Sequence, residues 1–535
     1  MRRPYTGAFT ALSAFALALD MSAQGPALAW ESFFDGSLPG VDQANALLVA
    51  GDNSVYVTGQ STNLAPQGTI TTLHYGSSGQ QIFVDHVYGA AQETVNKGVA
   101  LASDNIGHVY VCGAISNNGG DLALIKYRSS GRVWRENYEQ YPNAEVEDQA
   151  TGVAVDAEGR VYLAGYITST SGMGYDHFLI ATDSAGSVLW ADDPALSSAD
   201  EFAFDVAISA SGQPLLAGDW WNVDGSSGID MSTLRYTVNG THLWDRSFEG
   251  VGSDDHLRSL LATADDGAVL CGHAMGDSDQ DMTVVKFDAV GSQEWAVQYP
   301  GSGNADDEAV EAVELSDGRI AVVGRSRELV DGSLRHAIIV LVIDAGVVVW
   351  NAQYTGENEL GAWPTGIATD GLDNIHVSGY AVGAGGDYTD GVVLSYDADG
   401  TLAWSIGYDG PAGFDDRFND IALNSMGDVL VCGSTGTSAT ATRYVTVQYG
   451  NAVGVDEAGR RPEALDVRQG DRANCFVING LSPGEGLRAL DALGNELPLT
   501  GHRSGMRYDA QLPVSAGCYL LQATETWRIA RVVVR

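Results

Sequence analysis

Three aspartates at alternate positions have the spacing in this sequence that points most directly to chemistry. Asp277, Asp279 and Asp281 follow the pattern D-x-D-x-D, in which alternate carboxylates can converge on one Ca²⁺ ion. An EF-hand would have Gly at the next position and Glu at its end, where this chain has Met282 and Asp288. We therefore expect either a calcium loop of another kind between two strands or a solvated acidic loop.

Other carboxylates recur at two fixed places along the chain. Recurrence favours a structural task such as capping loop amides, because a catalytic group is needed only once. A carboxylate pair for cleaving a glycosidic bond is available, but no pair stands out from the rest. The first set is Asp121, Asp176, Asp230, Asp281 and Asp390, and the second is Glu93, Asp148, Glu201, Asp255, Asp307 and Asp416.

Familiar catalytic signatures are missing from the sequence. Gly480-Leu481-Ser482-Pro483-Gly484 has the G-x-S-x-G form of a nucleophile elbow. Pro483 has no N–H to donate to an oxyanion, so this segment is expected to be a turn. HExxH, Walker and dinucleotide-binding patterns do not occur. The sequence therefore identifies no catalytic residue and no cofactor-binding residue.

A repeat of about 54 residues organises most of the chain. Its clearest mark is an apolar strand that ends in Gly, such as Val109-Tyr110-Val111-Cys112-Gly113. The eight copies end at Gly59, Gly113, Gly165, Gly218, Gly272, Gly324, Gly379 and Gly433, at intervals of 54, 52, 53, 54, 52, 55 and 54 residues. Each unit contains four short strands joined by Asp/Gly turns, which predicts an antiparallel meander. Meanders stacked around an axis form a β-propeller.

The two ends of the repeat predict how the ring closes. The eighth unit stops at Tyr449, before the Gly-turn-Trp strand that ends the other units, and the missing strand stands near the N-terminus around Trp30. Pairing it with the last three strands leaves no open sheet edge, so we expect eight blades. The recurring tryptophans are expected to pack between blades, since the adjacent cysteines of quinone-dependent propeller enzymes are absent. They are Trp134, Trp190, Trp244, Trp295, Trp350 and Trp404.

Charge separates the repeat from the end of the chain. The formal net charge is -41, which argues against a nucleic-acid partner because a phosphate backbone would be repelled. Residues 451–535 contain ten Arg and ten Asp or Glu, so the negative charge belongs to the repeat. We expect a propeller at 24–450, a linker at 451–460 and a small β-sandwich-like domain at 461–535.

The N-terminus indicates export. Residues 1–23 combine Arg2 and Arg3 with a short apolar run and a small-residue exit, as in a secretory signal peptide. No apolar stretch of the mature chain is long enough to cross a membrane. The cysteines of the repeat, Cys112, Cys271 and Cys432, are expected to be small buried side chains. Cys475 and Cys518 of the last domain are either a disulfide or two free thiols.

Two family resemblances carry these expectations further. The units resemble the SBBP-type β-propeller repeat; the second has Val109–Gly113, Asp121-Leu122-Ala123-Leu124-Ile125-Lys126-Tyr127, then Gly131 and Trp134. Residues 461–535 resemble the C-terminal sorting domain (type A) of bacterial type IX secretion. Their matching segments are Leu487 to Leu497, Leu512 to Leu521 and the closing Arg528 to Arg535, whereas the usual Pro-Asn-Pro is absent.

The resemblances imply a place for the protein and leave two classes of function. They imply export by a type IX machinery to the outer cell surface or the medium, with the tail removed or used for attachment. The first class is a non-catalytic binding or adhesion platform for a glycan or a surface protein. The second is an extracellular polysaccharide hydrolase or lyase that uses carboxylates on a face of the propeller. The absence of a distinct His/Tyr/carboxylate cluster in any unit favours the first.

Overall fold

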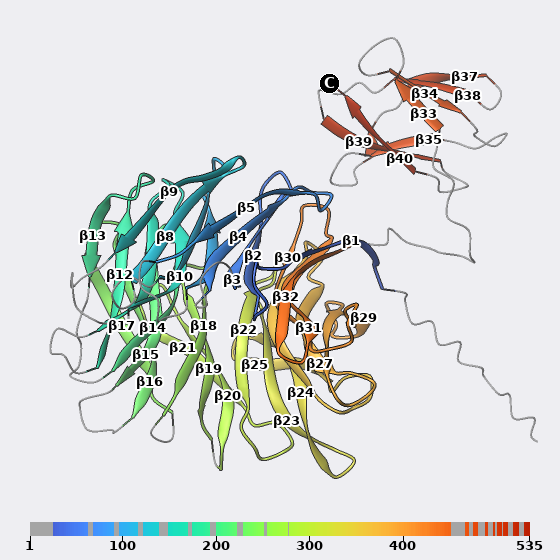
Figure 1. The fold of residues 1–535 in the computed structure, drawn as a ribbon. Helices are drawn as coiled ribbons and strands as arrows, with labels where there is room; N and C mark the ends of the chain where they lie inside the picture. Colours follow the sequence, from blue (N-terminus) through green and yellow to red (C-terminus); the bar gives the residue numbers. More distant parts are fainter. Residues whose placement is uncertain are drawn as a thin grey trace, which may run out of the picture. The chain divides into compact units, whose positions relative to one another are not determined.

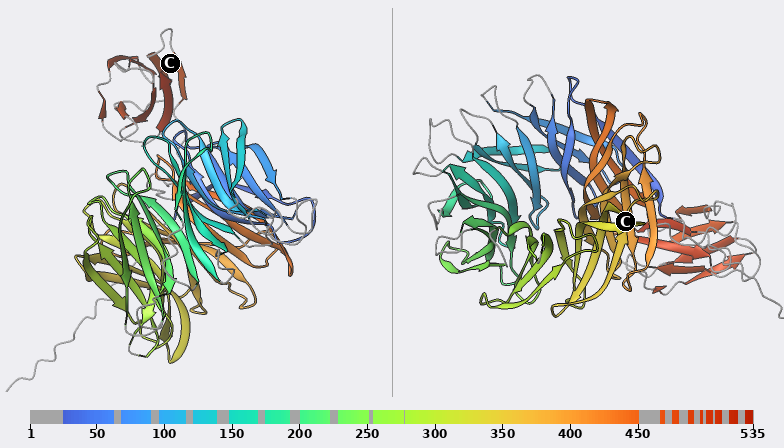
Figure 2. Two further views of the ribbon diagram at one scale, coloured as in Figure 1. Left: turned by 90° about the vertical axis from the view of Figure 1, so that its left-hand side faces the viewer. Right: turned by 90° about the horizontal axis from the view of Figure 1, so that it is seen from below.

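The structure, a computed structural model, describes residues 25–62, 68–89, 96–115, 121–138, 148–168, 174–192, 200–221, 228–250, 254–276 and 278–450, and short strands from 466 to 534. The chain divides into two compact units, Met1–Asn451 and Ala452–Arg535. The first unit consists of eight antiparallel four-stranded sheets, which follow one another around a ring (Figure 1; Figure 2, right). None of the described segments is a helix that could cross a membrane.

The first four blades take their strands in chain order. Blade 1 has β2 (Gln43–Val49), β3 (Val55–Ser61), β4 (Thr69–Tyr75) and β5 (Gln81–Val87); blade 2 has β6 (Lys97–Ser103), β7 (Val109–Ile115), β8 (Asp121–Arg128) and β9 (Gly131–Tyr138); blade 3 has β10 (Gln149–Val155), β11 (Val161–Thr168), β12 (Tyr175–Thr182) and β13 (Val188–Asp192); blade 4 has β14 (Glu201–Ile208), β15 (Pro214–Trp221), β16 (Ile229–Tyr236) and β17 (His242–Phe248).

The remaining blades repeat this order, except that the last one is composed of both ends of the repeat region. Blade 5 has β18 (His256–Ala262), β19 (Ala268–Met275), β20 (Gln280–Phe287) and β21 (Gln293–Tyr299); blade 6 has β22 (Glu308–Glu314), β23 (Ile320–Val330), β24 (Ser333–Asp344) and β25 (Val347–Tyr354); blade 7 has β26 (Ala362–Thr369), β27 (Ile375–Val382), β28 (Thr389–Tyr396) and β29 (Leu402–Tyr408); blade 8 has β30 (Asp416–Leu423), β31 (Val429–Ser438), β32 (Ala441–Gly450) and β1 (Ala27–Phe34).

Ring closure depends on one antiparallel pairing between the start and the end of the repeat region. Strand β1 pairs with β32 from Ala27 opposite Gly450 to Phe34 opposite Tyr444. The first strands of the blades form the inner ring, since each contacts the first strand of both neighbours, including β30 with β2. The predicted eight-bladed propeller, closed by the N-terminal strand, is therefore confirmed.

The second unit contains two further four-stranded sheets. In the first sheet the order is β33-β34-β38-β37, and in the second it is β36-β35-β39-β40. The strands are β33 (Asp466–Gln469), β34 (Cys475–Asn479), β35 (Leu487–Leu490), β36 (Glu496–Leu497), β37 (Thr500–Ser504), β38 (Arg507–Gln511), β39 (Gly517–Ala523) and β40 (Ile529–Val534). The side chains of Cys475 and Cys518, and all of residues 1–23, lie outside the described part of the chain.

The hydrophobic core lies between the blades. A separate cluster of buried apolar side chains fills the space between each pair of neighbours, including the pair formed by blades 8 and 1. The cluster between blades 8 and 1 joins Val57 and Leu73 to Leu430 and Tyr444, with Trp30 packed against it. The three cysteines of the repeat are fully buried free thiols in these layers, as predicted.

The recurring tryptophans pack against the following blade, as predicted, whereas blade 1 has Phe83 at this place. The ring of Trp190 lies against the turn glycine Gly240 of the following blade, where an added Cβ would meet the indole at 2.7 Å. Its indole N–H donates to the carbonyl of Val238 in the same turn at 2.9 Å. Trp30 of β1 lies in the same way against Gly79 of blade 1. The contact therefore recurs across the closure.

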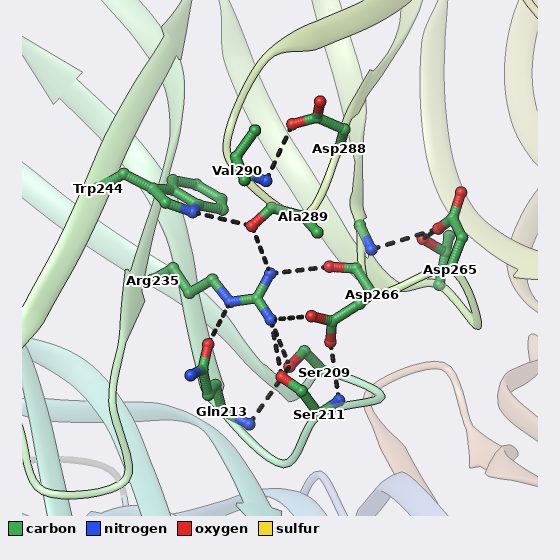
Figure 3. A network of polar contacts seen from close by, with 12 residues as sticks. Ser209, Ser211, Gln213, Arg235, Trp244, Asp265, Asp266, Asp288, Ala289 and Val290 are labelled. Atoms are coloured by element: carbon green, nitrogen blue, oxygen red, sulfur yellow. Dashed lines mark hydrogen bonds and ion pairs between the residues drawn. The ribbon is translucent and has the colours of Figure 1, made fainter.

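A buried arginine joins the turns of blades 4 and 5 (Figure 3). Arg235 is 2% exposed, and its guanidinium donates to Asp266 Oδ2 at 2.5 Å and to the Asp266 carbonyl at 2.8 Å. It also donates to Gln213 Oε1 at 2.8 Å and to the Ala289 carbonyl at 3.0 Å. A desolvated charge is tolerated in a protein only when it is paired and hydrogen-bonded in this way.

Replacing Arg235 with Ala is expected to lower the free energy of unfolding by about 3 kcal/mol, because it leaves buried acceptors without a donor. The measurement is urea unfolding followed by tryptophan fluorescence. Arg319→Ala is the matched control: Arg319 pairs with a half-exposed Asp317, so a loss of about 0.5 kcal/mol is expected. Equal losses in the two variants would contradict the role assigned to Arg235.

Candidate functional site

The two faces of the ring differ in their connections. On one face, which we call the turn face, tight turns join the first strand of a blade to the second and the third to the fourth. On the other, the loop face, the second strand is joined to the third and one blade to the next, mostly by longer connections; blades 6 and 8 have two-residue turns between their second and third strands. Both assignments follow from the antiparallel order of the strands. The sequence of the loop-face connections can vary, because these connections do not determine how the strands of a blade pair.

The predicted calcium loop lies on the loop face of blade 5. Asp277 lies outside the described residues. The Ser278 hydroxyl donates to Asp279 Oδ1 at 3.0 Å, and Asp281 is buried at the start of β20. Among the described residues, no third carboxylate lies close enough to Asp279 and Asp281 to complete a metal site with them. The calcium loop remains a prediction.

The recurring acids that precede the first strands cap backbone amides. Asp42 accepts from the N–H groups of Thr62 and Gly36, both at 2.5 Å. Equivalent bonds reach Asp148 from Thr168 N (2.9 Å), Asp255 from Gly250 N (2.6 Å), Asp307 from Arg327 N (3.0 Å) and Asp416 from Gly410 N (2.5 Å). The capping role that recurrence indicated is therefore present at Asp148, Asp255, Asp307 and Asp416, and the fully buried Glu201 has its Oε2 2.9 Å from His177 Nδ1. Glu93 lies outside the described residues, and Asn96 occupies the equivalent place.

A third set of carboxylates, which the repeat does not reveal, belongs to the inner strands. Asp205, Glu311 and Asp420 each follow a β-bulge in the first strand of their blade, a feature that re-aims side chains. Each accepts an amide N–H from the next blade: Leu260 N at 3.1 Å, Ile367 N at 3.0 Å and Leu47 N at 2.7 Å. These inner carboxylates therefore align neighbouring blades.

Burial disfavours the charged forms of the inner carboxylates. Burial raises the pKa of Glu311 to about 8, and the negative charge of Asp420 adds to the rise. Burial also raises the pKa values of Asp205 and Asp420 to about 6, against the opposing effect of their amide hydrogen bonds.

One cross-strand position, present in every blade, carries side chains that differ from blade to blade. It is the residue directly after the repeat glycine on the second strand, together with its partner on the first strand. From blade 1 to blade 8 the pairs are Gln43–Gln60, Lys97–Ala114, Gln149–Tyr166, Phe202–Asp219, His256–His273, Glu308–Arg325, Trp363–Tyr380 and Arg417–Ser434. The backbone place is constant while the side chain changes, as expected of a ligand-reading position.

In blades 5 to 8 these side chains, together with His336 of β24, form one series made of two runs of neighbouring groups, His256 to Arg325 and His336 to Arg417. We call it the loop-face arc: His256, His273, Glu308, Arg325, His336, Trp363, Tyr380 and Arg417. The imidazoles of His256 and His273 lie 5.1 Å apart, and His273 Nδ1 is 3.3 Å from Glu308 Oε1. Glu308 Oε2 then meets Arg325 Nε at 2.6 Å. The charge of Arg325 also reaches His336.

The aromatic end of the arc is a stacked platform. The rings of Trp363 and Tyr380 are 5.3 Å apart at an interplanar angle of 16°. His336 lies 4.9 Å from Trp363 on one side, and the Arg417 guanidinium lies 4.8 Å from the Tyr380 ring on the other. Trp363, Tyr380 and His336 are half-buried and Arg417 is exposed, so the platform is anchored and still reachable.

Electrostatics along the arc favour anions. Burial opposes the charged form of Glu308, but hydrogen bonds from His273 and Arg258 and the nearby arginine charges hold its pKa at about 2. Burial lowers the pKa of His336, and the positive charges of Arg327 and Arg325 lower it further. Arg327 and Arg417 form no ion pair within the described part of the chain.

The imidazole of His256 is oriented by a carboxylate. Its Nδ1 lies 2.7 Å from Asp219 Oδ2, and Asp219 Oδ1 accepts the Leu257 amide N–H at 2.7 Å. The hydrogen bond to Asp219 raises the pKa of His256 although burial opposes it. The side chain is 32% exposed. A histidine held in this way can act as a general acid or base.

Comparisons with known proteins identify no family. No protein-family model and no curated protein matches the chain. Similar solved structures include the polysaccharide lyase Uly1 (13% identity, 69% of this chain and 93% of that chain, TM-score 0.40), the β-propeller domain of the Trilobed protease from Pyrococcus furiosus (8%, 73% and 95%, 0.36) and BP39L lectin from Burkholderia pseudomallei (12%, 69% and 99%, 0.38). Likeness at this level carries no functional argument.

Replacing Glu311 with Gln is expected to remove part of the alkaline destabilisation of the propeller. The folded pKa of about 8 lies above the unfolded value, so the contribution of Glu311 is present at pH 4 and is lost as pH rises through 8. At pH 9 the variant should be more stable than the parent by about 2 kcal/mol, allowing for partial hydration. Urea unfolding at pH 5 and pH 9 measures this.

Asp317→Asn provides the control, since Asp317 is half-exposed and its pKa is lowered, chiefly by the Arg319 amide. A gain for Glu311→Gln that is the same at both pH values would show that ionisation of Glu311 is not the cause.

Proposed function

We propose that this chain is an exported, non-catalytic binding protein whose propeller holds an anionic polysaccharide against the loop-face arc. The observation that carries the proposal is the set of eight equivalent cross-strand pairs. In blades 5 to 8 these pairs form one series of aromatic and cationic groups, whereas blades 1 and 2 have Gln43–Gln60 and Lys97–Ala114 at the same place.

The aromatic platform supports a saccharide ligand. The apolar face of a sugar ring packs on an aromatic face, and the stacked pair Trp363–Tyr380 offers a flat surface that is already in place. Pre-formed aromatic surfaces lose little conformational entropy on binding. His336 on one edge and Arg417 on the other supply polar groups at the rim of the platform.

The arginines support a negatively charged ligand. A guanidinium pairs with a carboxylate or sulfate through two parallel hydrogen bonds, and Arg327 and Arg417 have no described carboxylate partner within ion-pair distance. The chain as a whole carries a formal charge of -41. A polyanion is therefore repelled elsewhere on the surface, so the arc confers specificity as well as affinity.

Export is part of the proposal and is supported by sequence alone. Residues 1–23 have the charge and apolar pattern of a signal peptide, and 461–535 resemble a type IX sorting domain. The SBBP-type resemblance of 28–450 is consistent with a surface or secreted propeller. These features support a place for the mature protein outside the cell, where anionic polysaccharides are accessible.

A lyase is the second candidate, and the His256–Asp219 pair is the observation that favours it. In β-elimination from a uronate, His256 would accept the C5 proton while an arginine neutralises the adjacent carboxylate. The C4–O bond would then break to leave a C4–C5 double bond, and the departing oxygen would take up a proton. Arg258, whose positive charge acts on His256, would supply that arginine.

Binding of the full chain to polygalacturonate, a sulfated dextran and neutral dextran, measured by calorimetry at two salt concentrations, tests the proposal. We expect the anionic polymers to bind more weakly at higher salt and neutral dextran not to bind. Trp363→Ala should weaken binding about tenfold or more through loss of the platform. Arg417→Gln should weaken it and reduce its dependence on salt.

Two matched variants control this experiment. Trp221 is 40% exposed at the end of β15 in blade 4, outside the arc, so Trp221→Ala should bind like the parent. Arg128 is exposed at the end of β8 on the turn face, and Arg128→Gln should also have no effect. Equal losses in all four variants, or none in Trp363→Ala, would contradict the site. Unsaturated products that disappear in His256→Ala would establish the lyase instead.

A further inference from the structure

Two recurring acidic positions meet at each junction between blades. One is the start of the third strand of a blade, and the other is the start of the first strand of the next blade. Backbone hydrogen bonds place them side by side: Asp255 N donates to the carbonyl of Ile229, the residue before Asp230, at 2.6 Å. Asp307 N likewise donates to the carbonyl of Gln280, next to Asp281, at 2.7 Å.

The residue types at the two positions change together. Both are carboxylates at five junctions: Asp121 with Asp148, Asp176 with Glu201, Asp230 with Asp255, Asp281 with Asp307 and Asp390 with Asp416. At the other three they are Thr69 with Asn96, Ala337 with Ala362 and Arg443 with Asp42. At each junction the chain therefore has two acids, no acid, or one acid opposite an arginine. Two adjacent buried carboxylates repel unless a proton or a cation lies between them, so this pattern points to a shared cation.

The junction of blades 7 and 8 adds a third carboxylate. Asp390 is the second residue of β28, Asp409 directly follows β29, and Asp416 begins β30. One oxygen from each lies within 4.8 Å of the other two. Oxygens on opposite sides of a Ca²⁺ ion are about 4.6–5.2 Å apart, since Ca–O distances are about 2.3–2.6 Å. The cluster therefore has the dimensions of half a calcium coordination sphere.

Asp416 is the most buried residue of the cluster, and one of its carboxylate oxygens accepts no hydrogen bond of normal geometry. Asp416 is 1% exposed, and its Oδ2 accepts the Gly410 amide N–H at 2.5 Å. Its Oδ1 has no hydrogen bond of normal geometry, although the hydroxyl of Thr435 is close to it. Asp255 and Asp307 at two other junctions are also 2% and 1% exposed, with one such oxygen each. Leaving a buried carboxylate oxygen without a partner is costly, and a cation would remove that cost.

Charge and access are also consistent with a cation. The three carboxyl groups lie close enough to repel one another, and a cation between them would relieve that repulsion. Asp409 is exposed, which leaves an entry path from solvent. All three ligands are hard oxygen donors, which favour Ca²⁺ over Zn²⁺.

We propose that Asp390, Asp409 and Asp416 bind a Ca²⁺ ion that ties blade 8, the blade formed by both ends of the repeat region, to blade 7. Water and the Thr435 hydroxyl complete its coordination. With one exposed ligand, the site belongs with extracellular modules, for which the dissociation constant is about 10⁻⁴ to 10⁻³ M. The proposal is independent of the polysaccharide site, which lies on other residues.

Calcium titration of the full, chelator-treated chain by calorimetry, combined with thermal unfolding in EDTA and in millimolar Ca²⁺, tests the site. The parent should bind Ca²⁺ and unfold several degrees higher with it. Asp409→Asn should lose one site, and its gain in melting temperature on adding Ca²⁺ should be much smaller than that of the parent. In EDTA, however, it should be at least as stable as the parent, because one repelling charge is gone. A merely structural Asp409 would destabilise the chain in both conditions.

Three further variants make the outcome decisive. Asp390→Asn repeats the test from a different strand, in case Asp409→Asn fails to fold. Asp399→Asn changes an exposed carboxylate in the opposite turn of the same blade and should behave like the parent. Asp279→Asn separates this site from the D-x-D-x-D loop. Unchanged Ca²⁺ binding in both Asp409→Asn and Asp390→Asn, or its loss only in Asp279→Asn, would overturn the proposal.

Discussion

The architecture depends on the pairing of β1 with β32. Without it, blade 8 would lack its outer strand, and the unpaired edge of β32 would be exposed. The Trp30 ring crosses this closure to the turn glycine Gly79 of blade 1, just as Trp190 crosses to Gly240 elsewhere. Asp420 also crosses it by accepting the Leu47 amide. One strand thus makes a linear array of meanders into a ring in which every blade is held on both sides.

A closed ring allows a division of labour between positions. Residues that recur in each blade, such as the junction acids and the outer-strand tryptophans, hold the blades together and repeat because the contact repeats. The position after the repeat glycine does not recur in this way. Its residue changes from Gln60 in blade 1 to His273, Arg325 and Tyr380 in blades 5 to 7. The candidate functional residues therefore lie at the position whose residue type differs between blades.

Most of the fold could be predicted from sequence, because it rests on periodicity. The spacing of the repeat glycines, the position of Trp30 and the Asp/Gly turns each predict a feature that the strand pairing contains. The loop-face arc was missed for a physical reason. Its successive members are eleven or more residues apart in the chain, as Arg325 and His336 are, and only the curvature of the ring aligns successive blades. Aligning the residues after the eight glycines would have revealed it.

The same limit explains the carboxylates. Sequence spacing drew attention to Asp277, Asp279 and Asp281, which are neighbours in the chain. The structure instead assembles Asp390, Asp409 and Asp416 from the ends of three strands and two blades. The inner carboxylate Glu311 was also missed, since its orientation depends on a bulge that no residue type signals. Local patterns predict elements well, whereas ligand geometry arises between elements.

The central claim is that the loop-face arc of blades 5 to 8 receives the ligand. Hydrogen–deuterium exchange of the full chain, with and without a uronate oligosaccharide, tests it most directly. The account predicts slowed exchange confined to the loop-face strand ends around His273, Arg325, His336, Trp363 and Tyr380, with blades 1 and 2 unchanged. Protection spread evenly over all eight blades, or centred on the turn face, would contradict it.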